Sequence, residues 1–234
     1  MKRLGLLLIT ATLLLSACNT PTKEKGCASD VDWVDFIKFN DIMYGFTGHL
    51  QTSKPNVKLG PKIGEVKYKL TGNACSNHEV QHADAAFLPV GTPIYEQLGY
   101  KHEFRLIAGD KIYQVMVNPK AKFVKELYDI EGKVEKITIF RDTHDQDIRT
   151  IEQSKTNALT NLFLEREIIG FEEIFKRGVP KTEYQFFIDF HLKDGTAVRS
   201  LYRSASEIMN PGVLLGAGME KELKEIIKKE WSIE

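Results

Sequence analysis

The longest regular alternation in the chain lies in its C-terminal third and constrains the fold most strongly. Apolar residues occupy every second position from 184 to 192: Tyr184, Phe186, Ile188, Phe190 and Leu192. This period of two is typical of a strand with one buried face. The dipeptide Asp194-Gly195 favours a tight turn, and Val198–Tyr202 can form the returning strand. A hairpin of this kind requires a second layer that covers its apolar face.

The segments around this hairpin supply further strands and the covering helices. Residues 134–140 and 148–151 are predicted strands on either side of a polar turn. A helical period begins at Leu159, Leu162 and Phe163, is interrupted at Gly170, and resumes at Phe171. The last helix presents one apolar face, made of Met219, Leu223, Ile226, Ile227 and Trp231. Residues 121–234 therefore predict the order ββαββα.

The N-terminal half is richer in strand signals. We expect a strand at 33–39 that continues through Ile42–Tyr44, a loop region marked by glycine and proline from 45 to 61, and a strand at 66–70. Residues 103–117 predict a hairpin around Ala108-Gly109-Asp110. The predicted fold class is α+β: a β-rich N-terminal unit, compatible with a partly open barrel, followed by the ββαββα unit.

The first 18 residues have the composition of an export signal. Met1-Lys2-Arg3 precedes an apolar run, Leu4 to Leu15, that is shorter than the roughly 20 residues of a membrane-spanning helix. The run ends in Leu15-Ser16-Ala17-Cys18, which resembles the lipobox of bacterial lipoproteins. The resemblance implies cleavage before Cys18, diacylation of its thiol (diacylglycerol and palmitate), and retention at the outer face of the cell membrane. An ordinary secreted protein that is cut elsewhere is the alternative.

Domain boundaries follow from these segments. We expect a signal peptide over 1–17, the lipidated cysteine and a polar tether over 18–28, a β-rich domain over 29–120, and the ββαββα domain over 121–234. Loss of Lys2 and Arg3 with the leader lowers the cationic residues from 32 to 30, against 32 acidic residues. This balance argues against nucleic acid as a partner.

A second resemblance adds a location and no activity. Residues 84–95, with Gly99-Tyr100 and Phe104-Arg105-Leu106, are similar to segments of uncharacterised lipoproteins from spore-forming Gram-positive bacteria. What the resemblance implies is again a place outside the cytoplasm.

The three cysteines are Cys18, Cys27 and Cys75. With Cys18 lipidated, Cys27 and Cys75 are candidates for a disulfide, which persists outside the cytoplasm. Two buried free thiols are the alternative interpretation.

Two short segments could carry metal chemistry. His78-Glu79-Val80-Gln81-His82 fits the H-E-x-x-H pattern, in which two histidines on one helical face share a zinc ion. This resemblance to zinc metalloproteases covers five residues, so His78 and His82 are weak ligand candidates and a polar loop is the competing interpretation. Residues 142–147 gather three carboxylates and His144 without the spacing of an EF-hand, which favours a solvated turn.

Other side chains point to packing or to a partner. His191, beside Asp189 on the polar side of the 184–192 strand, is expected at the surface. Most aromatic residues of the N-terminal half belong in a core, and some could line a groove for a partner. They are Trp33, Phe36, Phe39, Tyr44, Phe46, Tyr95, Tyr100 and Phe104.

The functional expectation is a membrane-anchored extracytoplasmic lipoprotein that is not an enzyme and binds a cell-envelope protein or other envelope ligand. No cofactor is expected, and the expected membrane contact is the lipid on Cys18. The alternative is a zinc-dependent envelope hydrolase built on residues 78–82. A substrate-binding lipoprotein of a transporter is disfavoured because the chain lacks repeated βα units.

Overall fold

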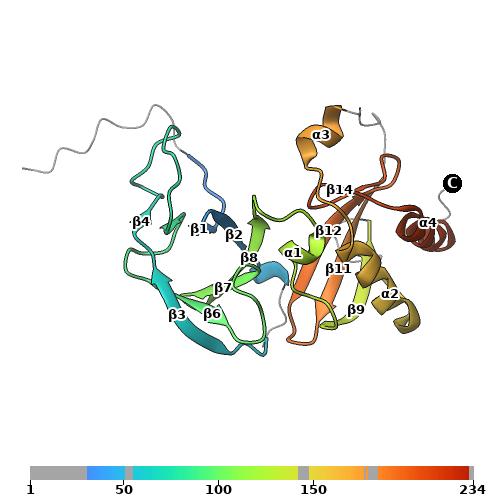
Figure 1. Cartoon of the computed structure of the whole chain (residues 1–234), viewed down its shortest axis with the longest axis horizontal. Helices are drawn as coiled ribbons and strands as arrows, with labels where there is room; N and C mark the ends of the chain where they lie inside the picture. Colours follow the sequence, from blue (N-terminus) through green and yellow to red (C-terminus); the bar gives the residue numbers. More distant parts are fainter. Residues whose placement is uncertain (1–30, 51–54, 142–147, 177, 179–183, 232–234) are drawn as a thin grey trace, which may run out of the picture.

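The computed structural model describes residues 31–50, 55–141, 148–176, 178 and 184–231. Within these residues the chain forms an eight-stranded sheet, a six-stranded sheet and four α-helices (Figure 1). None of these helices has both the length and the apolar character that a membrane-spanning segment needs.

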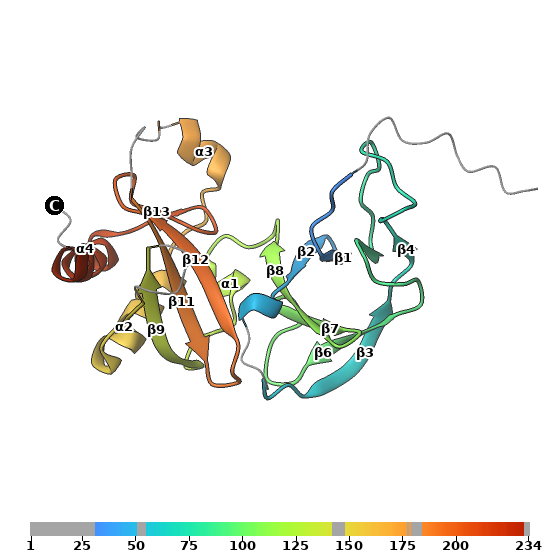
Figure 2. The ribbon, with the colours of Figure 1, turned by 180° about the vertical axis from the view of Figure 1, so that it is seen from behind.

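The first sheet is mainly antiparallel and has the order β3-β6-β7-β8-β2-β1-β5-β4. Its strands are β1 (Phe36–Phe39), β2 (Ile42–Phe46), β3 (Leu59–Glu65), β4 (Tyr68–Lys69), β5 (Asp84–Ala85), β6 (Pro93–Gln97), β7 (Arg105–Ala108) and β8 (Lys111–Val117). A short 3-10 helix, η1 (Gly48–Leu50), follows β2. The sheet curls into a half-barrel that stays open (Figure 2).

The second sheet has the order β10-β9-β11-β12-β13-β14 and is antiparallel throughout. Its strands are β9 (Val134–Phe140), β10 (Arg149–Thr150), β11 (Gln185–Leu192), β12 (Ala197–Arg203), β13 (Ile208–Met209) and β14 (Val213–Leu214). The helices are α1 (Val124–Leu127), α2 (Gln153–Leu164), α3 (Phe171–Lys176) and α4 (Ala217–Trp231). The predicted α+β class, with a partly open barrel before a unit of strands and helices, is confirmed.

Helices α2 and α4 cover one face of the second sheet, as their apolar periods require. The ring of Phe163 on α2 stacks on Phe190 of β11 at 5.0 Å between centroids, and Trp231 of α4 lies 5.4 Å from Phe186. Met219, Leu223 and Ile227, three of the five residues predicted for the apolar face of the last helix, are buried, and Ile226 and Trp231 pack partly buried against the same core. Within residues 121–234 the observed order adds the short helix α1 before β9, a separate helix α3 after Gly170, and the short strands β13 and β14 to the predicted ββαββα pattern.

Both predicted hairpins are confirmed. Strands β11 and β12 pair in register from Gln185 opposite Arg203 to His191 opposite Ala197, around the predicted Asp194-Gly195 turn. Strands β7 and β8 pair from Arg105 opposite Gln114 to Ala108 opposite Lys111.

The expected continuous strand from 33 through 44 is wrong. Asn40 and Asp41 have φ angles of 50° and 65°, so the chain turns there and β2 returns antiparallel to β1. Two consecutive residues with positive φ form the turn whose twist matches that of paired strands. Asn and Asp tolerate this conformation better than other residues that carry a side chain.

The expected loop from 45 to 61 and the strand at 66–70 also need correction. Strand β2 continues to Phe46, and β3 begins at Leu59 and includes Gly60 and Pro61. A proline is tolerated there because β3 is an edge strand, and its pairing with β6 is interrupted twice by shifts of register. In the 66–70 segment only Tyr68 and Lys69 pair as a strand, although Val66 and Leu70 are buried as predicted.

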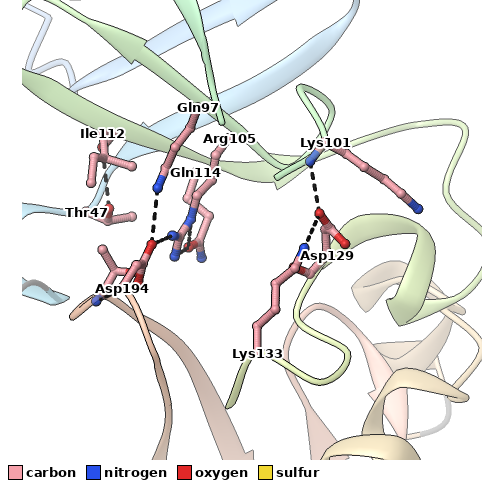
Figure 3. Close-up of polar contacts among 10 residues, drawn as sticks. Thr47, Gln97, Lys101, Arg105, Ile112, Gln114, Asp129, Lys133 and Asp194 are labelled. Carbon is pink, nitrogen blue, oxygen red and sulfur yellow. Dashed lines mark hydrogen bonds and ion pairs between the residues drawn. The ribbon is translucent and has the colours of Figure 1, made fainter. Parts of the chain in front are cut away.

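A buried arginine joins the two sheets. The Arg105 side chain on β7 is fully buried, and its Nη1 donates to Oδ2 of Asp194 at 3.0 Å (Figure 3). Its Nε and Nη2 both donate to Oε1 of Gln114, at 3.3 and 3.0 Å. The guanidinium carbon also lies 4.7 Å from the ring centre of Tyr100 and 4.6 Å from that of Phe104.

The carboxylate of Asp194 accepts further hydrogen bonds besides the one from Arg105. Its Oδ1 accepts from the backbone nitrogen and the hydroxyl of Thr196, and its Oδ2 also accepts from Nε2 of Gln97 at 3.1 Å. Burial raises the pKa of Asp194, but the hydrogen bonds from Thr196 and the charge of Arg105 outweigh burial and hold the pKa below its ordinary 3.8. The β11–β12 turn is thereby fixed against the first sheet, and one cluster of buried apolar side chains runs through both sheets.

Removal of the carboxylate should destabilise the protein strongly. Asp194→Ala leaves the Arg105 cation buried without a counter-charge, so we expect a loss of about 3–5 kcal/mol in the free energy of unfolding. Urea titrations followed by tryptophan fluorescence would measure it. The control is Asp110→Ala in the exposed turn between β7 and β8, for which about 0.5 kcal/mol or less is expected. Equal effects of the two substitutions would contradict the role given to the pair.

The Arg105–Asp194 pair should also make the stability of the protein depend on pH. Because the folded-state pKa of Asp194 lies below 3.8, its contribution is complete above that pH and is lost as the pH falls through the folded-state value. The difference in stability between the wild type and Asp194→Asn should therefore narrow below about pH 3.8. A difference that stays constant down to acid unfolding would contradict this assignment.

Candidate ligand-binding cleft

A cleft of about 540 Å³ lies where the first sheet faces the second. Small-molecule and cofactor sites in proteins have volumes of this order, with mostly apolar linings and a few polar groups at defined positions. The lining fits this description. Its residues are Gly45, Phe46, Thr47, Gln114, Val115, Met116, Val117, Asn118, Leu127, Tyr128, Ile168, Gly170, Phe171, Arg199, Asn210 and Pro211.

One wall consists of the ends of β2 and β8. The register of this pair shifts so that Met116 is an extra residue between the partners of Met43 and Tyr44. Such a bulge redirects the side chain that it carries. A Cβ at Gly45 would overlap the sulfur of Met116, so glycine at this position allows the methionine to lie across β2.

The other wall is built by the segment before α3 and by the turn between β13 and β14. The backbone nitrogens of Ile169 and Gly170 both donate to the carbonyl of Gly212, at 3.0 and 3.1 Å. A Cβ at Gly212 would lie 3.1 Å from the Cα of Gly170, so the two backbones can approach this closely only without a side chain. This contact positions Phe171 opposite the first wall.

The charged side chain of the lining is already neutralised. Arg199 of β12 donates through Nε and Nη2 to the two carboxylate oxygens of Asp189, both at 2.7 Å. Its guanidinium carbon lies 4.9 Å from the ring centre of Phe140 and 5.3 Å from that of Phe187. Among the described lining residues Arg199 is the single ionised one at neutral pH, since burial raises the pKa of Tyr128.

His191, expected at the surface, is half-buried, and its neighbour Asp189 is buried. Asp189 is buried under its ion pair with Arg199, and the imidazole of His191 lies 2.8 Å from the hydroxyl of Thr138. Burial lowers the pKa of His191. The same face of β11 also carries the ring of Phe187, which stacks on Phe140.

The aromatic residues divide into core and cleft as the composition suggested. Phe36, Phe39, Tyr44 and Phe104 are buried, whereas Phe46 lines the cleft. The sequence analysis did not identify Gln114, Met116, Phe171 or Arg199 as cleft residues. One signal was present: apolar residues fill consecutive positions at the end of β8, where an alternating strand would have placed a polar one.

The H-E-x-x-H segment is not helical. Residues 78–82 form an extended loop and the start of a turn, so the histidines do not share a helical face. Nε2 of His78 lies 3.0 Å from Oδ2 of Asp84, and its ring stacks on Tyr68 at 5.2 Å. Nδ1 of His82 accepts instead from the backbone nitrogen of Asn40 at 3.1 Å. In the described part of the chain, no three His, Cys, Asp or Glu side chains gather in a way that could hold a metal ion.

The remaining candidate residues lie mostly outside the described part of the chain. Cys18, Cys27 and the acidic segment 142–147 belong to that group. Cys75 is described and is disulfide-bonded. Its pairing with Cys27 stays a prediction.

Comparison with known proteins adds no assignment. No protein-family model matches this chain, and neither a curated protein nor a solved structure shows significant similarity to it.

The predicted disulfide can be counted chemically. The processed protein, denatured without reductant, should show no free thiol, and Cys75→Ser should expose one thiol on Cys27. Because the bond would close a loop of about 48 residues, the substitution should cost roughly 3–4 kcal/mol in the loop-entropy model. Two thiols in the unreduced wild type would contradict the pairing.

Proposed function

We propose that this chain is a lipoprotein anchored through Cys18 at the outer face of the cell membrane, and that its folded part is a non-enzymatic binding module. The ligand site of the module is the cleft between the two sheets. The proposed ligand is a protein or another component of the cell envelope.

The anchoring part of the proposal rests on the sequence of the leader. A basic start, a short apolar run and small residues before Cys18 are the features that export and lipid attachment require. Each methylene buried in a bilayer contributes about 0.8 kcal/mol, and two acyl chains suffice for stable attachment. The tether after Cys18 is short and polar, which would hold the folded part close to the membrane.

The binding part rests on one observation, the chemistry of the cleft lining. Catalysis by proton transfer or nucleophilic attack needs side chains with accessible pKa values or an activated nucleophile. The described lining offers apolar side chains, amides, the hydroxyls of Thr47 and Tyr128, and an arginine that is already paired. This set is suited to holding a ligand and provides no group to transform it. The zinc-dependent alternative gains no support, because residues 78–82 do not form the helix that it needs.

Release of the protein after loss of the cysteine tests the anchor. Cys18→Ala should shift the protein from the membrane fraction to the culture medium, because the acyl chains that hold it cannot be attached. Immunoblots of membrane, cytoplasm and medium would measure the shift. Thr20→Ala, two residues further along the tether, is the matched control and should remain in the membrane fraction. Retention of Cys18→Ala in the membrane would contradict the proposal.

A further inference from the structure

Gln114 places a hydrogen-bond donor in the cleft that has no acceptor among the described residues. Its side chain belongs to a residue that is 6% exposed, and it lines the cleft. Its Oε1 accepts from two nitrogens of Arg105, which fixes the orientation of the amide, because a reversed amide would set donors against donors. Nε2 therefore faces away from Arg105. Within the described part of the chain, this nitrogen makes no hydrogen bond.

Further neutral polar groups lie in the same lining. The side-chain amide of Asn210, on the opposite wall, makes no hydrogen bond within the described residues. The hydroxyl of Thr47 has one long contact, 3.4 Å to the carbonyl of Ile112. Figure 3 shows the contact of Thr47 with Ile112 and that of Gln114 with Arg105. A ligand that fills the cleft with hydrocarbon alone would leave these groups desolvated and unpaired, which is unfavourable.

The charges of the cleft do not favour an anionic ligand. Arg199 is satisfied by both oxygens of Asp189, and the Arg105 cation beneath Gln114 is paired with Asp194. A carboxylate or a phosphate entering the cleft would lose hydration without an unpaired cation to compensate. The complementary ligand is therefore uncharged and carries carbonyl oxygens.

Apolar side chains remain exposed along both rims. Met116 and Val117 on the first wall are 50% and 56% exposed, and Phe171 on the second wall is 38% exposed. Phe175, 54% exposed, stacks on Phe171 at 6.1 Å and extends this surface along α3. Exposed apolar side chains that gather around a concave site mark a surface for an apolar partner.

We propose that the cleft binds an uncharged peptide segment of a partner protein, with apolar side chains against Met116 and Phe171 and a backbone carbonyl that accepts from Nε2 of Gln114. A peptide offers a carbonyl at every residue together with apolar side chains, which an acyl chain does not. This inference rests on the proposed binding function and assigns the class of ligand.

The test uses the full chain in lipid nanodiscs and two pools of end-blocked, fluorescently labelled heptapeptides. One pool has apolar residues at its three central positions, and the other has aspartate there. Fluorescence anisotropy should show saturable binding of the apolar pool and none of the acidic pool, with empty nanodiscs as the blank. Equal binding of the acidic pool would overturn the inference.

Gln114→Glu tests the hydrogen bond itself. The glutamate keeps an acceptor for Arg105 but replaces the donor that faces the cleft, so binding should weaken by about tenfold, as expected for one buried hydrogen bond. Gln81→Glu makes the same change in an exposed loop and should bind as the wild type does. Unchanged binding by a folded Gln114→Glu protein would overturn the inference.

Met116→Lys serves as a second variant that does not disturb the buried cluster. The lysine places a charge on the rim and should abolish binding of the apolar pool, whereas Val90→Lys, at a residue 63% exposed and outside the cleft lining, should not. Binding of a labelled dodecanoyl amide in the absence of peptide binding would overturn the peptide assignment and leave the binding module standing. Failure of both probes to bind would overturn both.

Discussion

The buried pair of Arg105 and Asp194 is the interaction on which the arrangement of the two sheets depends. A guanidinium removed from water is tolerated only when its donors and its charge are satisfied. Here Asp194 and Gln114 accept three hydrogen bonds, and two aromatic rings cover the planar faces. Arginine suits this position because its planar guanidinium can donate several hydrogen bonds and stack on aromatic rings at the same time. The ammonium of lysine is a point charge and cannot do both.

The same pair connects the core to the cleft through Gln114. The carbonyl oxygen of Gln114 is used by Arg105, and this contact directs its amide nitrogen toward the cleft. The turn that carries Asp194 belongs to the β11–β12 hairpin, and β12 also carries Arg199 in the cleft lining. The cleft is thus shaped by the contact between the sheets, and its polar groups are oriented before a ligand arrives. Such preorganisation lowers the entropic cost of binding.

Local patterns predicted the hairpins and helices but not the contact between the sheets. The β11–β12 hairpin could be predicted from the alternation over 184–192 and the Asp194-Gly195 turn alone. Helix α4 could likewise be predicted from its own apolar face. Arg105 alternates with apolar neighbours, a pattern that suggests an exposed position, yet β7 is buried on both faces. Its partner lies 89 positions further along the chain. Asp194 likewise resembled a simple turn residue in the sequence. The turn at Asn40-Asp41 and the edge strand through Pro61 form because of the strands that pair with them, and these partners cannot be recognised from the local hydrophobic pattern. The cleft residues share this origin, since they come together only when the sheets meet.

The proposed anchor and the proposed peptide site also depend on each other energetically. A cleft of this size with a few neutral hydrogen-bonding groups supports only modest affinity, because much of the contact energy offsets the ordering of a flexible peptide. Attachment of both partners to one membrane raises their effective concentration, so a modest site can still be occupied. The short tether also raises the effective concentration, because it limits the volume that the cleft can explore. A neutral lining then has a further consequence: selectivity must come from the fit of apolar side chains and from the carbonyl at Gln114, since long-range attraction of charges contributes little at such a site.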